Sequence, residues 1–147
     1  MPQVSTGPFQ NQVIPIAASY AFGPNDTYAS LQADAAFPSA AVGGIIVSLP
    51  GYDSAVPANP VHGAAIPSYA LALPSNGDFY TFADPTLQLS DSRVVTIWGG
   101  GFQLYDPFAE VLRTYITCTI PGTGLDFTFD RAAGLWIVED CSVPVPD

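Results

Sequence analysis

Fifteen prolines and thirteen glycines are spread along this chain of 147 residues and divide it into short segments. Proline removes a backbone hydrogen-bond donor, and both residues interrupt helices, so long helices are nearly excluded. Nine Phe, seven Tyr and two Trp supply ample apolar surface for a core, and the length fits one domain. We therefore expect an all-β domain of short strands joined by many turns.

Apolar runs between the turn residues mark the expected strands. Asn76-Gly77 between two such runs is a strong hairpin signal. The Gly99–Gly101 run lacks the following helix and the lysine of a phosphate loop, so it predicts a bulge or corner. Asp106-Pro107 predicts a short helical turn. The strands expected before residue 100 are Ala17–Phe22, Gly44–Leu49, Tyr69–Leu73, Phe79–Phe82 and Arg93–Trp98.

The last third of the chain alternates most clearly between apolar and polar residues. Turn residues at Pro121–Gly124 and Ala132–Gly134 separate three segments, which predicts a C-terminal three-stranded meander. With the earlier strands it would form an antiparallel sandwich or partly closed barrel of roughly seven to nine short strands, within a single domain over residues 17–147. The side chains expected on the buried face of the meander are Ile116, Cys118, Ile120, Leu125, Phe127, Phe129, Leu135, Ile137, Cys141 and Val143.

Residues 1–16 predict an extended N-terminal arm. Pro2, Pro8 and Pro15 lie among small and amide side chains, so the segment is unsuited to a central strand. Four apolar residues would gain roughly 1.5–3 kcal/mol each on full burial, which a neighbouring subunit could provide. The expected interface anchors of the arm are Phe9, Val13, Ile14 and Ile16.

The two cysteines, Cys118 and Cys141, would lie on the outer strands of the meander. Strands separated by one other are roughly 9–10 Å apart, beyond the Cα spacing of about 4.4–6.8 Å that a disulfide needs. We expect two buried free thiols, and a disulfide remains open if these strands belong to different sheets.

Candidate catalytic and ligand residues have simpler interpretations. His62 is the only histidine, lies in a proline-rich segment and has no nucleophile elbow nearby. Asp126 and Asp130 share the outer face of one expected strand, roughly 13 Å apart, which is wider than paired glycosidase acids. Asp78 and Asp84 belong to turns. We expect solvated aspartates, an interface or solvated histidine, no metal site and no cofactor.

The charge pattern bears on partners. The chain has no lysine, three arginines and thirteen acids, for a net charge of −10. Direct nucleic-acid binding and binding to an anionic membrane are therefore not expected. Lysine and glutamate are the residues most depleted at protein interfaces, and only 11% of the residues are charged. This composition suits a subunit packed among other protein subunits.

The function expected from these features is structural. The chain would be a non-enzymatic subunit of a large assembly, best matched by a bacteriophage virion protein, either a capsid decoration (cement) protein or a tail component. It would form a homo-oligomer or contact major capsid or tail proteins, after synthesis in the host cytoplasm, because no segment resembles a signal peptide. Two alternatives remain: a carbohydrate- or receptor-binding β-module of a fibre or lectin-like protein, and a small oligosaccharide-active enzyme.

Overall fold

Two mixed sheets of short strands make up the chain in a computed structural model, which describes residues 13–22, 28–51, 73–107 and 109–140. Its one helical element there is the 3-10 turn η1 (Ala40–Val42). The seven-stranded sheet contains, in spatial order, β1 (Val13–Ile16), β3 (Tyr28–Leu31), β5 (Phe79–Ala83), β10 (Gly124–Asp130), β11 (Leu135–Asp140), β7 (Gln103–Asp106) and β8 (Val111–Arg113). The four-stranded sheet contains β2 (Tyr20–Ala21), β4 (Ile45–Ser48), β6 (Val95–Trp98) and β9 (Tyr115–Cys118).

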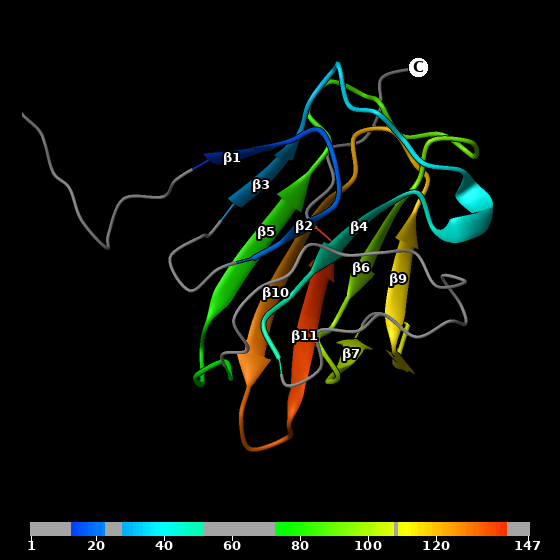
Figure 1. Cartoon of the computed structure of the whole chain (residues 1–147). Coiled ribbons are helices and arrows are strands. Elements are labelled where there is room, and N and C mark those ends of the chain that lie inside the picture. The colour runs from blue at the N-terminus through cyan, green and yellow to red at the C-terminus, as the bar shows by residue number, and fades with distance from the viewer. Residues whose placement is uncertain (1–12, 23–27, 52–72, 108, 141–147) are drawn as a thin grey trace, which may run out of the picture.

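The two sheets share one hydrophobic core, which gives a sandwich-like arrangement (Figure 1). The all-β prediction is confirmed. Three buried aromatic rings, those of Phe22, Tyr80 and Trp136, pack in series: Phe22 and Tyr80 are tilted with centroids 4.8 Å apart, and Tyr80 and Trp136 meet edge to face at 5.7 Å. Core side chains from the four-stranded sheet include Ile45, Val47, Val95 and Ile97, and those from the seven-stranded sheet include Leu31, Phe82, Leu104, Phe127 and Trp136.

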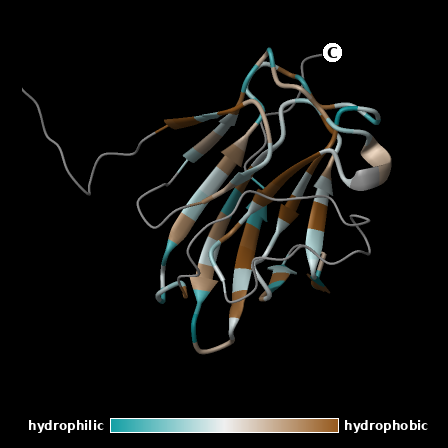
Figure 2. Cartoon of the chain, viewed as in Figure 1, coloured by the Kyte–Doolittle hydropathy of each residue, from teal (hydrophilic) through white to brown (hydrophobic). Residues whose placement is uncertain are grey.

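The sequence pattern of each strand follows its burial. All four residues of β4 and all four of β6 are buried, as expected for parallel strands covered on both faces, which tend to be continuously apolar. In β10, buried and half-buried residues alternate, because one face meets the core. Figure 2 shows hydrophobic colour concentrated on the strands.

The predicted antiparallel arrangement is wrong, because the sheets are mixed. Among the described strands, five of the nine pairings are parallel: β1 with β3, β3 with β5, β11 with β7, β2 with β4, and β4 with β6. Parallel neighbours need long connections, and the loops between apolar runs give no signal of which strand the chain will join. Turn residues typical of hairpins can therefore also connect a strand of one sheet to a strand of the other.

The predicted C-terminal meander is also not found. β10 and β11 form the expected hairpin, but β9 pairs with β6 in the other sheet, and β10 pairs with β5 instead. Within the hairpin, Asp130 lies opposite Leu135, so Trp136 and Val138 are buried rather than Leu135 and Ile137. A shift of one residue in register exchanges the two faces of a strand.

The Gly99–Gly101 run lies at a corner where the chain passes from β6 in one sheet to β7 in the other. Gly100 has a φ of 70° and Gly101 a φ of 102°, which L-residues with side chains rarely adopt. The run is thus a corner, as predicted. At Asp106 the chain makes a turn between β7 and β8, and the Asp106 carboxylate accepts a hydrogen bond from the Ala109 N–H at 3.2 Å, as the predicted cap would; Phe108 lies outside the described residues.

The described part of the predicted arm is β1, an edge strand of the seven-stranded sheet. Ile16 is buried in the core of the domain, whereas Val13 is 60% exposed and Ile14 is half-buried. Phe9 lies outside the described residues. Of the predicted anchors, Ile16 is therefore already covered by its own domain. No helix in the described ranges is long and apolar enough to cross a membrane.

Candidate functional site

A groove of about 720 Å³ lies where β9, at the edge of the four-stranded sheet, faces β7, β8 and β11 of the seven-stranded sheet. The two layers leave a gap at this side of the molecule. Residues from five strands and from the turn between β9 and β10 line it. Because it combines apolar and polar lining residues in one concave surface, the groove is a candidate binding site.

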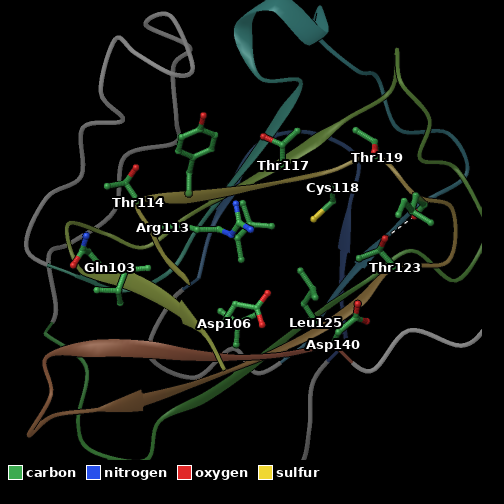
Figure 3. Close-up of a pocket in the computed structure, with 15 residues that line it drawn as sticks. Gln103, Asp106, Arg113, Thr114, Thr117, Cys118, Thr119, Thr123, Leu125 and Asp140 are labelled. Carbon is green, nitrogen blue, oxygen red and sulfur yellow. Dashed lines mark hydrogen bonds between the residues drawn. The ribbon is translucent and has the colours of Figure 1, made fainter. Parts of the chain in front are cut away.

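The floor of the groove is apolar and continuous with the core. Cys118 of β9, Leu125 of β10 and Val138 of β11 are only 5%, 7% and 5% exposed. Figure 3 shows Cys118 and Leu125 pointing toward each other across the space between the layers. Alternation in β9 and β10 directs these side chains inward, so the groove opens directly onto the hydrophobic interior.

The rim of the groove combines hydroxyl groups with charges of both signs. Arg113 of β8 faces a space that Asp106 of β7 and Asp140 of β11 also line (Figure 3). Two exposed apolar residues complete the rim: Leu112 is 50% exposed and Ile120 is 67% exposed. The hydroxyl and amide groups of the rim belong to Gln103, Thr114, Tyr115, Thr117, Thr119 and Thr123.

The turn that closes one end of the groove is held by a buried carboxylate. Asp84 is 1% exposed, and its two oxygens accept hydrogen bonds from the backbone N–H groups of Gln88 (2.8 Å), Leu89 (2.9 Å) and Gly122 (3.2 Å). The Thr123 hydroxyl donates to the carbonyl of Ile120 at 2.6 Å. These bonds fix the 120–123 turn beside the groove.

Other aspartates serve turns and strand pairing. The carboxylate of Asp78 accepts from the Ser75 N–H, that of Asp130 accepts from the Ala133 N–H, and that of Asp126 accepts from the Thr81 hydroxyl across two strands. Asp84 is buried rather than solvated, contrary to the prediction, because a carboxylate that accepts several N–H bonds can be retained in the interior.

Cys118 is a free, buried thiol at the floor of the groove. Burial raises its pKa to about 12, and the negative charge of Asp140 adds to the increase. Because the thiolate is the nucleophile, a thiol with such a pKa is unreactive near neutral pH. The strand geometry that led us to expect free thiols was wrong, since β9 and β11 belong to different sheets, and Cys141 lies outside the described residues.

We expect Cys118 to resist thiol reagents until the domain unfolds. In a Cys141→Ser variant, Ellman's reagent at pH 8 should react slowly with the folded protein and completely in denaturant. Thr117→Cys, which adds an exposed thiol next to it on β9, should react at once. Asp140→Asn should leave Cys118 protected, because burial is the larger cause of its raised pKa. Rapid reaction of folded Cys118 would contradict the buried position.

The structure does not bring the predicted interface residues to the groove. Val13, Ile14 and Ile16 lie on β1, at the opposite edge of the seven-stranded sheet from β8. His62 lies outside the described residues. No pattern in the sequence indicates that Arg113, Asp106 and Asp140 are neighbours, because they come from separate strands. Alternation did predict the inward directions of Cys118 and Leu125.

Comparisons with known proteins found no matching family model, no matching curated protein and no matching solved structure. Within the described ranges, no group of three or more His, Cys, Asp or Glu side chains is placed to hold a metal ion.

Proposed function

We propose that the chain is a structural subunit of a large assembly, a bacteriophage virion protein of the capsid decoration (cement) or tail type, that acts through protein–protein contacts. The observation that carries this proposal is the edge formed by β8 and β9. Val111, Leu112 and Ile120 are exposed there, beside the apolar floor of the groove. A surface of this kind favours another protein as its partner.

The four edge strands in the described part of the chain differ in how well they are protected against pairing with another chain. Natural edge strands are kept from pairing with other chains by charge, proline or shortness. β1 contains Pro15, β2 has two residues, and β8 has three residues and carries Arg113. β9, with the sequence Tyr-Ile-Thr-Cys, has four residues and neither charge nor proline. The edge of β9 is thus the least protected against strand addition.

The composition supports the same proposal. A chain without lysine lacks the side chain that most often keeps an exposed strand edge soluble. The partners proposed are copies of this chain and major capsid or tail proteins, and the location proposed is the virion, after synthesis in the host cytoplasm. Mass spectrometry of purified particles should then find the chain in many copies per particle.

We expect the purified chain to self-associate and the association to depend on the β8–β9 edge. Light scattering should give an oligomer for the unaltered chain and a lower mass for Leu112→Lys and Ile120→Lys, which place a charge on the exposed apolar rim. Ala132→Lys is the matched control, because it adds the same charge in the exposed loop at the other end of β11 from the groove. A monodisperse monomer at high concentration would overturn the proposal.

A carbohydrate- or receptor-binding module is the second candidate. The observation that favours it is the polar rim, which includes Tyr115, several threonines, Gln103 and the carboxylates of Asp106 and Asp140. Aromatic rings with surrounding hydrogen-bonding groups can bind sugars. A small oligosaccharide-active enzyme would have to use the same two carboxylates. A monomeric chain that binds an oligosaccharide in this groove would favour these candidates over the assembly subunit.

A further inference from the structure

We propose that the groove between β9 and the seven-stranded sheet accepts residues 1–12 of a second copy of this chain, an inference that rests on the proposed role as an assembling subunit. The segment would add along the open edge of β9 and place an apolar side chain on the floor formed by Cys118, Leu125 and Val138.

The position of the groove relative to β1 sets the geometry of this contact. In the seven-stranded sheet, β1 and β8 occupy opposite edges, separated by about 28 Å at the usual spacing between strands. Figure 1 shows β1 on one side of the molecule and β7 and β9 on the other. Residues 1–12 join the fold at Val13, so the point where the donor segment begins and the acceptor groove lie at opposite edges of the seven-stranded sheet.

A contact between two different surfaces is heterologous, and repeated heterologous contacts produce rings or filaments. We expect each chain to donate its segment to one neighbour and to accept a segment from another, so that assemblies grow head to tail; reciprocal exchange within one pair would instead close a two-fold dimer. Head-to-tail growth suits a repeated subunit of a shell or tube and differs from isologous pairing of two β9 edges.

The chemistry of the segment matches the groove. Residues 1–12 contain no charged side chain, so the segment can lie between Arg113 and the two rim carboxylates without burying an unpaired charge. Val4 and Phe9 are suited to the apolar floor. Its Gln, Asn, Ser and Thr side chains can exchange hydrogen bonds with the threonines of the rim.

Addition of a strand to the edge of a sheet supplies backbone hydrogen bonds independently of sequence, while alternate side chains enter pockets. Among the described strands, β9 pairs only with β6. Pro2 and Pro8 are compatible with an added outer strand, because their missing N–H groups can face away from the sheet. In the described part of the chain, the other edge of β9 is therefore open to an added strand, and Cys118 of the same strand belongs to the apolar floor.

Cysteine cross-linking between two differently labelled chains tests the proposal. In full-length chains that carry Cys141→Ser and keep Cys118, whose buried thiol is unreactive, one chain carries Gln10→Cys and the other Thr117→Cys. Mild oxidation of the mixture should give a disulfide-linked dimer, about tenfold more than with the control acceptor Ala132→Cys, because docking raises the local thiol concentration. A single chain with Gln10→Cys and Thr117→Cys should give a ladder of linked chains.

The outcomes separate this inference from the proposed function. If light scattering shows oligomers but cross-linking at Thr117→Cys does not exceed that at Ala132→Cys, the groove is not the acceptor and only this inference fails. If the chain is monomeric and no cross-link forms, both fail. An internal disulfide without a ladder would assign the groove to the chain's own N-terminal segment and overturn exchange between copies.

The chain's own C-terminal residues are the other possible occupant, because Asp140 at the groove is followed by residues 141–147. A chain with Thr117→Cys and Ser142→Cys in the same background distinguishes the two. Efficient internal disulfide formation in this chain, together with no cross-linking to Gln10→Cys, would overturn the proposal. Cross-linking to Gln10→Cys alone supports it.

Discussion

Replacing Gly44 with alanine is expected to lower the free energy of unfolding by about 4 kcal/mol or more, a loss that few single substitutions produce. Gly44 has a φ of 65°. A Cβ atom added there would lie 2.0 Å from the carbonyl oxygen of Val94 and 2.7 Å from its Cγ2. That oxygen accepts the Ile45 N–H at 3.0 Å, at the start of the pairing between β4 and β6. Urea unfolding of the purified variant measures the loss.

Gly134 provides the matched control. It has a similar φ of 68°, but a Cβ atom there would have no neighbour within 4 Å. Gly134→Ala should therefore cost only the backbone penalty for a left-handed residue, about 1–2 kcal/mol. The difference between the two variants isolates the steric contact with Val94. Equal losses at both positions would show that β4 and β6 do not approach as closely as the structure places them.

Strands with a clear apolar run or a clear alternation, such as β4, β5, β6, β10 and β11, could be predicted from local patterns, whereas β1, β3 and β8 were not predicted. The run Ile45-Ile46-Val47 is apolar, Val95–Trp98 is apolar except for Thr96, and both became central strands buried on two faces. The alternation in Leu125–Phe129 correctly predicted which side chains of β10 meet the core. The three consecutive glycines correctly predicted a corner, because only glycine adopts such φ angles readily.

The pairing of strands could not be predicted in the same way. The Pro121–Gly124 turn resembles a hairpin turn, yet it carries the chain from one sheet to the other. Alternation in β9 indicates that Cys118 faces the core, but it does not indicate to which of the two sheets β9 belongs. The choice depends on long-range packing, for example of Cys118 opposite Val95 on β6, and no local pattern records it.

The groove was missed for the same reason. Its rim joins Asp106, Arg113 and Asp140, which are separated by up to 34 positions along the chain and become neighbours only when β7, β8 and β11 assemble. One part of its signature was visible in the sequence: Thr114–Ile120 is the longest alternating segment without charge or proline. A strand of that kind is protected from unwanted pairing only inside a sheet or in contact with a partner, and in the structure it lies at the edge of the four-stranded sheet.

Asp84 shows how a residue dismissed as a turn aspartate can support the site. Its oxygens accept hydrogen bonds from backbone N–H groups in two loops: those of Gln88 and Leu89 in its own loop, and that of Gly122 in the turn beside the groove. The N–H of Asp84 also donates to the carbonyl of Thr123 at 2.9 Å. The groove is therefore shaped partly by a side chain that does not line it.

Asp84→Ala is accordingly expected to lower the free energy of unfolding by about 3–5 kcal/mol, because it leaves three backbone N–H groups without their acceptor, each at about 1–3 kcal/mol when buried. Asp84→Asn should lose roughly half as much, since its remaining oxygen can still accept from two of them. Chemical denaturation measures both losses, and hydrogen exchange should show faster exchange at Leu89 and Gly122.

Asp78→Ala is the control for this series, because the Asp78 carboxylate accepts a single bond, from the exposed Ser75 N–H at 2.8 Å. Its expected cost is about 1 kcal/mol or less. If the 120–123 turn is held as the structure shows, Asp84→Ala should also weaken self-association at the β8–β9 edge, whereas Asp78→Ala should not. Loss of stability in Asp84→Ala without faster exchange at Gly122 would show that the carboxylate stabilises only its own loop and does not hold the 120–123 turn beside the groove.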